Sequence, residues 1–154
     1  MLFRSIEVRG RSGRTLRETW GEDDATAHLG ITVPDFPNFF MLLGPNTIAG
    51  HGGSAALGIE MEVRYVMRML ARMVGEGLAT VECRQDVHDA YVARLDAAMQ
   101  GTIWVHPGMT TYYRNSRGRV VSTMPWTNTE YWHMTHEPDL ADFRVEPAGE
   151  RSPA

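Results

Sequence analysis

The groups best suited to chemistry in this sequence of 154 residues are backbone amides rather than catalytic side chains. Three glycines, Gly50, Gly52 and Gly53, precede Ser54, and an apolar-rich run covers residues 55–74. Glycine permits a tight turn and a close approach to a ligand, and serine commonly begins a helix. The first amides of a helix have no partner inside it and lie at the positive end of its dipole. The pattern predicts a place for an anion or an electron-rich oxygen, and a tight turn without a ligand is an equal alternative.

Other chemical motifs have the wrong spacing. His133 and His136 can share a helix face and bind zinc, but a zinc protease helix needs the order His-Glu-x-x-His. The sequence Gly52-Gly-Ser54 lacks the Gly-x-Ser-x-Gly elbow of a hydrolase. The acidic residues fall on predicted helix surfaces and loops. We therefore expect no metal site and assign no catalytic side chain.

The glycine turn lies between two predicted apolar elements. Residues 39–43 form an unbroken apolar segment, which predicts a strand buried on both faces, and Gly44 ends it. The run after Ser54 predicts a helix that continues to residue 74. Its core-facing stripe is expected at three- and four-residue spacing: Ile59, Val63, Val66, Leu70 and Met73.

The remaining elements are shorter. Thr15 and Glu18 have the spacing of a capping box at the start of a short helix. A strand is expected at residues 79–84 and an amphipathic helix at 85–100. Further strands are expected at 102–105, 110–113 and 120–123, followed by a short helix that ends before Pro138.

Composition limits the class of protein. An apolar content of 43% and a charged content of 22% are typical of a folded soluble domain. Fifteen basic and nineteen acidic residues give a net charge of −4, so we expect no nucleic-acid partner. The sequence has no apolar run of about 18 residues, so no membrane partner is expected. Cys83 is the single cysteine, which excludes an intramolecular disulfide and fits a cytoplasmic protein.

A family resemblance covers nearly the whole chain, from about Ile6 to about Val145. The sequence Phe36-Pro-Asn-Phe-Phe-Met-Leu-Leu-Gly-Pro-Asn-Thr, with Leu29-Gly-Ile-Thr-Val-Pro upstream, resembles the C-terminal third of flavin-containing monooxygenases of the Baeyer–Villiger class. The 4-hydroxyacetophenone monooxygenase branch is the most similar. The resemblance implies a mixed α/β fold, namely the C-terminal portion of a flavoprotein with two dinucleotide-binding domains.

The resemblance also implies a division of the chain and a cofactor site. Residues 1–101 would be the C-terminal part of an FAD-binding domain, residues 102–145 an aromatic, β-rich cap, and residues 146–154 a frayed tail. Backbone amides of the turn would bind the flavin edge where negative charge collects on reduction. The residues expected along or beside the flavin are Gly44, Pro45, Asn46, Thr47, His51, Gly52, Gly53 and Ser54.

The complete enzyme would use FAD and NADPH to insert oxygen next to the carbonyl of a small-molecule ketone, with an aryl ketone as the finer expectation. Six aromatic residues lie between positions 104 and 132, and Trp104, Tyr112 and Trp126 are candidates for a wall of the substrate cleft. A small satellite core is the alternative for this cluster, and it is favoured because buried aromatic side chains mostly pack against one another.

The sequence lacks parts that such an enzyme needs. No Gly-x-Gly-x-x-Gly fingerprint follows a predicted strand, and both fingerprints of the family would lie upstream of Met1. We therefore expect a fragment or subunit that is inactive and binds no cofactor tightly by itself. It would pair with the N-terminal part or self-associate through its exposed apolar strand. The alternative is a stand-alone, non-catalytic module that binds a small molecule or a protein.

Overall fold

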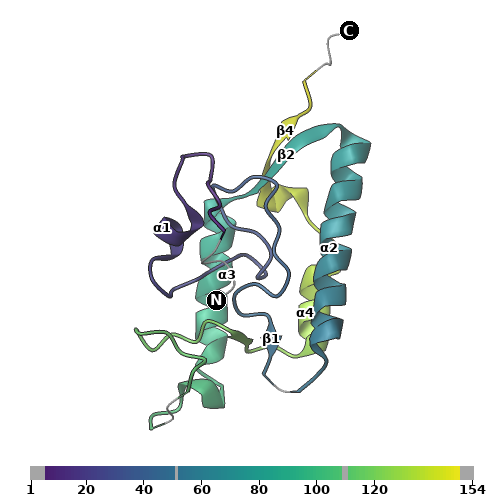
Figure 1. Cartoon of the computed structure of the whole chain (residues 1–154). Helices are drawn as coiled ribbons and strands as arrows, with labels where there is room; N and C mark the ends of the chain where they lie inside the picture. The colour runs from purple at the N-terminus through teal and green to yellow at the C-terminus, as the bar shows by residue number, and fades with distance from the viewer. Residues whose placement is uncertain (1–5, 51, 109–110, 150–154) are drawn as a thin grey trace.

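The computed structural model describes residues 6–50, 52–108 and 111–149. Four α-helices, four short strands and two 3₁₀ turns alternate along this part of the chain, with long irregular segments between them (Figure 1). In chain order the elements are α1 (Leu16–Trp20), β1 (Ile48–Ala49), α2 (Ala55–Glu76), β2 (Leu78–Cys83), α3 (Gln85–Met99), η2 (Ile103–Val105), β3 (Thr123–Met124), α4 (Asn128–Thr135), η3 (Leu140–Asp142) and β4 (Phe143–Pro147).

The main core lies between α2, α3 and the strand β2 that joins them. β2 pairs antiparallel with β4, and Val81 and Cys83 lie opposite Val145 and Phe143. This pair lies at one end of α2 and α3 (Figure 1). The core side chains come from these three elements, from residues 29–31, from β4 and from the segment before β3: Leu29, Ile31, Tyr65, Met69, Met73, Val81, Cys83, Tyr91, Leu95, Met99, Val120 and Phe143.

The long helix α2 forms where the sequence predicts it. The Ser54 hydroxyl accepts the Ala56 N–H at 3.2 Å as the N-cap. Gly77 ends the helix in the left-handed conformation with φ of 66°, which costs glycine nothing because it has no Cβ. The capping box of α1 is also present, with the Thr15 hydroxyl and the Glu18 carboxylate each accepting the other residue's backbone amide.

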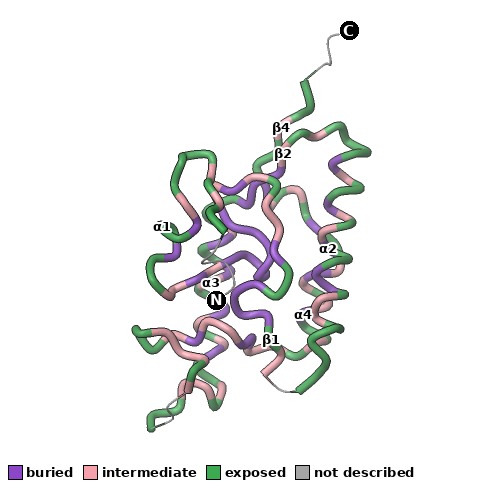
Figure 2. The backbone as a smooth tube through the Cα atoms, in the orientation of Figure 1, coloured by how far each residue is buried: buried purple, intermediate pink, exposed green. Residues whose placement is uncertain are grey.

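The predicted core-facing stripe of α2 is wrong for Val63 and Leu70. Met73 is buried, Val66 is partly buried and packs against the main core, and Ile59 is half-buried. The buried residues are Met61, Glu62, Tyr65, Met69 and Met73. Val63 and Leu70 are 40% and 39% exposed. The outer side of α2 is exposed along much of its length (Figure 2). The helix therefore carries two apolar stripes, and the described part of the chain covers one.

The predicted strand at residues 39–43 is also wrong. Among the described residues the sheets are β1 with β3 and β2 with β4, and neither includes this segment. Met41 is buried, but Leu42 and Leu43 are 46% and 44% exposed. Leu43 has φ of 53°, which is incompatible with an extended strand. An apolar run becomes a strand only beside another strand that accepts its backbone hydrogen bonds, and none of the described strands lies there.

The region after α3 has less β structure than the sequence predicts. Residues 103–105 form the 3₁₀ turn η2 instead of a strand, and Thr110 lies outside the described residues. Val120 makes a single antiparallel bridge with Arg114. Thr123 and Met124 form β3, which pairs in parallel with β1. β1 lies between the turn at residues 44–47 and the glycine turn. The predicted short helix is confirmed as α4, which starts with a capping box between Thr127 and Glu130.

Candidate functional site

The turn at residues 44–47 is buried and held from several sides. The Asn46 N–H donates to Val121 O at 3.1 Å. The Asn46 side-chain amide donates to the carbonyls of Val120 and Thr123, at 2.9 Å each. A Cβ added at Gly44 would come within 2.0 Å of the Gly30 carbonyl oxygen, so only glycine fits there. The turn is therefore a rigid part of the fold.

A buried glutamate supports the start of this turn. Glu62 has no exposed surface, and its Oε2 accepts the Leu43 N–H at 2.7 Å. Its Oε1 lies 3.3 Å from the Tyr131 hydroxyl, which donates to Leu29 O at 2.7 Å. Because the single Tyr131 proton serves Leu29, a neutral Glu62 can donate to the Tyr131 oxygen. Burial raises the pKa of Glu62, although the Leu43 amide opposes this shift.

The N-terminus of α2 presents free amides next to the turn. Among the described residues, the N–H groups of Gly53, Ser54 and Ala55 donate no hydrogen bond. Gly52 and Gly53 have φ of 86° and 139°, which L side chains rarely adopt. All four residues 52–55 are exposed. His51, predicted to face the cofactor, lies outside the described residues.

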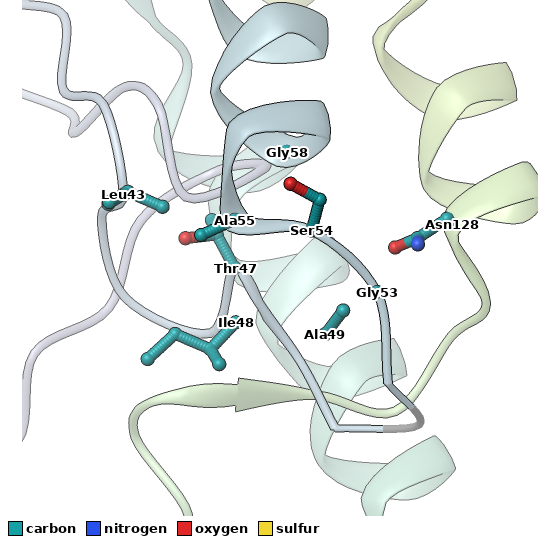
Figure 3. A pocket seen from close by; sticks show the side chains of 9 residues that line it. All are labelled: Leu43, Thr47, Ile48, Ala49, Gly53, Ser54, Ala55, Gly58 and Asn128. Atoms are coloured by element: carbon teal, nitrogen blue, oxygen red, sulfur yellow. The ribbon is translucent and has the colours of Figure 1, made fainter.

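A pocket opens at this helix N-terminus (Figure 3). It encloses about 410 Å³ of empty space, including solvent at its mouth, and its wall is largely apolar. The lining residues are Leu43, Thr47, Ile48, Ala49, Gly53, Ser54, Ala55, Gly58 and Asn128. Asn128 is the first residue of α4, and a Cβ added at Gly53 would lie 2.6 Å from the Asn128 amide nitrogen. The structure thus brings Thr47, Gly53 and Ser54 of the predicted site into one pocket.

The three aromatic candidates for the cleft wall lie in different environments. Trp104 packs against the glycine turn, because a Cβ at Gly50 would lie 2.8 Å from the indole nitrogen. Trp126 lies over α3, with its ring 5.6 Å from Tyr91 and 5.1 Å from the Arg94 guanidinium. Tyr112 is 86% exposed. Of these candidates, Trp104 is the one in contact with the turn.

Sequence reasoning missed Glu62 and Asn128. The expectation that acidic residues lie on helix surfaces and loops is wrong for Glu62. A signal was present, since Glu62 lies between Met69 and Met73 in helical projection, within the buried stripe. Asn128 carries no comparable signal, because its place beside Gly53 depends on how α4 packs against α2.

The structure gives no support to other kinds of site. Within the residues it describes, no group of three or more histidine, cysteine or acidic side chains could hold a metal ion. The rings of His133 and His136 pack against Trp132, with centroids 5.0 and 4.4 Å away. No helix of the described chain is long and apolar enough to cross a membrane.

No protein-family model matches this chain. Individual proteins are nevertheless similar to it in sequence and in fold. The chain is 47% identical over 142 residues to an uncharacterized monooxygenase, y4iD, from Sinorhizobium fredii, covering 92% of this chain and 22% of the relative. It is 34% identical over 139 residues to a Baeyer–Villiger monooxygenase from Streptomyces coelicolor, covering 90% of this chain and 26% of the relative.

The chain is homologous to the C-terminal part of flavin monooxygenases. Its fold matches oxidized steroid monooxygenase bound to NADP with a TM-score of 0.76 at 24% identity, over 90% of this chain and 26% of that one. It matches closed cyclohexanone monooxygenase with a TM-score of 0.76 at 22% identity, over 96% and 28%. The predicted fold class, a mixed α/β portion of a large flavoprotein, is confirmed. The chain spans about a quarter of the length of these relatives.

Proposed function

We propose that this chain supplies the flavin-facing turn, and one wall of the substrate cleft, of an FAD- and NADPH-dependent Baeyer–Villiger monooxygenase. The observation that carries the proposal is the row of free amides at Gly53, Ser54 and Ala55, beside a pocket at the end of a rigid turn. The homology to Baeyer–Villiger and FAD-binding monooxygenases supports it independently.

The residues present fit the edge of a flavin. Free N–H groups at the positive end of α2 suit electron-rich oxygen and nitrogen atoms, and the φ values of Gly52 and Gly53 suit a close backbone approach. When bound, the flavin supplies the redox chemistry and the activation of oxygen. The protein groups bind its edge, orient it against the turn and help to exclude water. The side-chain N–H groups of Asn46 are already bonded to the carbonyls of Val120 and Thr123, so they do not bind the flavin.

The finer proposals concern the substrate and the partner. We propose a ketone as substrate, an aryl ketone in particular, as in the 4-hydroxyacetophenone branch. Trp104 is the best candidate for the cleft wall because it packs on Gly50. FAD and NADPH are proposed for the complete enzyme, and the isolated chain, with only one side of the site, is expected to bind neither tightly.

A chimera tests this function. The segment of the Sinorhizobium fredii relative that matches this chain is replaced by the chain itself, and the purified chimera is assayed for bound FAD and for NADPH oxidation with a panel of alkyl and aryl ketones. We expect FAD in a one-to-one ratio and ketone-dependent NADPH oxidation. The isolated chain is titrated with FAD in parallel, and submicromolar stoichiometric binding there would contradict the expectation that part of the site lies elsewhere.

Two glycines of α2 offer a matched pair of variants. A Cβ at either Gly58 or Gly75 meets no neighbouring atom, but Gly58 lines the pocket whereas Gly75 lies near the other end of the helix. Gly58→Leu would fill the pocket and is expected to lower the FAD content or ketone turnover of the chimera at least about tenfold, through steric exclusion. Gly75→Leu should leave both unchanged. Equal behaviour of the two variants would remove the pocket from the proposed site.

A further inference from the structure

Four exposed apolar residues follow one line along the outer side of α2. Val63, Met67, Leu70 and Val74 recur at spacings of four, three and four. At 100° per residue they fall within an arc of about 60°, over a length of about 17 Å. Met67 and Val74 are 59% and 85% exposed. We call these four residues the outer stripe.

Two arginines of α2, Arg68 and Arg72, do not cover the outer stripe. Arginine stems often lie over apolar surface and shield it from water. Arg68 instead donates to the His136 carbonyl and pairs with Glu137. Arg72 donates to Pro138 O at 3.1 Å and to Glu76 at 3.0 Å. Both guanidinium groups are thus held by Glu76 and the segment that follows α4, on the side of α2 away from the outer stripe. All four residues of the outer stripe are exposed.

A second uncovered apolar surface lies near the first turns of α2. Leu42 and Leu43 end the apolar run at residues 39–43, and Ile48 is 48% exposed. Leu43 and Ile48 line the same pocket as Ala55 and Gly58. The run has the composition of a buried strand, and α2, with apolar residues on two sides, has the composition of a helix buried between two layers. Both patterns require cover that the described chain does not supply.

We propose that the outer stripe is the docking surface for the remaining three quarters of a flavin monooxygenase polypeptide. This inference rests on the proposed function. The length of the relatives indicates what covers the outer stripe. Two relatives match 90–92% of this chain, and 74–78% of their own length lies outside the match. A second copy packed helix against helix would cover the stripe but would not explain the strand-like run at residues 39–43. The remainder of a monooxygenase accounts for both surfaces.

The chimera described above tests this surface through the double variant Val63→Glu with Leu70→Glu. Both positions are exposed in the isolated chain, so its melting temperature should change little. In the chimera the same two charges would be buried without partners, and we expect the soluble yield to fall at least about tenfold. Ala71→Glu, an exposed position of α2 outside the stripe, is the control for added charge and should leave both proteins unchanged.

Several outcomes would overturn the proposal. They are an insoluble wild-type chimera, a chimera that tolerates the double variant, and an isolated chain that is destabilised as much as the chimera. Light scattering of the isolated chain adds another: a dimer that the double variant dissociates would make a second copy the occupant. The two proposals fail separately. If the chimera loses soluble yield on the double variant but carries no FAD, the docking surface is supported and the proposed function is wrong. If the chimera is active and FAD-loaded and tolerates the double variant, the proposed function is supported and the docking surface is wrong.

Discussion

Replacing Glu62 with glutamine should stabilise the chain increasingly as the pH rises. The carboxyl is fully buried beneath the turn, and burial raises its pKa above the ordinary value of 4.5. Between 4.5 and that raised pKa, the folded state keeps a proton that the unfolded state has lost. Stability therefore falls as pH rises through this window, by at most about 1.4 kcal/mol per pH unit for one proton. Above the folded-state pKa the effect is constant.

Glutamine reproduces the bonds of the neutral acid. Its carbonyl can accept the Leu43 N–H, and its amide can donate to the Tyr131 oxygen. The variant should be within about 1 kcal/mol of the wild type near pH 4.5, because no partner is lost. Glu62→Leu leaves the Leu43 amide without its acceptor and should cost about 1–3 kcal/mol at the same pH.

Urea unfolding, followed by far-ultraviolet circular dichroism between pH 4.5 and 8, measures these differences. The quantity of interest is the unfolding free energy of Glu62→Gln minus that of the wild type, in which other titrations cancel. Glu60→Gln, on an exposed position of the same helix, controls for the change in net charge. If the Glu62→Gln protein is less stable by more than about 2 kcal/mol and the difference does not vary with pH, the carboxyl is ionised in the fold, and the neutral-acid reasoning is refuted.

Two further buried groups give independent predictions. Burial lowers the pKa of His28 from 6.5 to about 4. The stability of the chain is therefore fully present above pH 6.5, and up to about 3 kcal/mol of it is lost as pH falls to 4. His28→Phe, whose ring would keep the edge contact with Tyr91 at 5.3 Å, should abolish this loss in the same urea series, and an unchanged loss of stability at acid pH would contradict the prediction. Asp142 at 4.0 Å would favour a charged ring, but desolvation is the larger effect. Burial also raises the pKa of the Cys83 thiol to about 12, so the folded chain should react with a thiol reagent at least about a hundredfold more slowly than the urea-unfolded chain, and equal rates would show that the thiol is accessible.

The predictions that succeeded depend on neighbours in sequence. Ser54 and Thr15 act as caps through bonds to residues two or three positions away, and Gly77 ends α2 through its own φ. These signals involve only a few consecutive residues, so they can be found without knowledge of the tertiary contacts. The glycine turn before α2 rests on the same kind of local signal, and its role in ligand binding stays a prediction.

The contacts of the site that could not be predicted are long-range. Glu62 reaches Leu43 and Tyr131, which lie 19 and 69 positions away, and Asn46 is anchored by Val120 and Thr123. β1 pairs with β3 across more than 70 positions and contains only two residues. Pairs this distant leave no periodic pattern in the sequence, and only the packed structure reveals which polar groups are already satisfied and which amides remain free.

The two errors in the apolar pattern have one physical cause. Periodicity shows that a face is to be buried, but not which part of the polypeptide buries it. Val63 and Leu70 were predicted to face a core and are exposed, and residues 39–43 were predicted to form a buried strand and have no strand beside them among the described residues. Residues 39–43 end at the pocket beside the N-terminus of α2, and Val63 and Leu70 lie farther along the same helix. The relatives extend far beyond the matched region. Both errors are therefore expected if these apolar residues belong to a core that the chain shares with additional polypeptide.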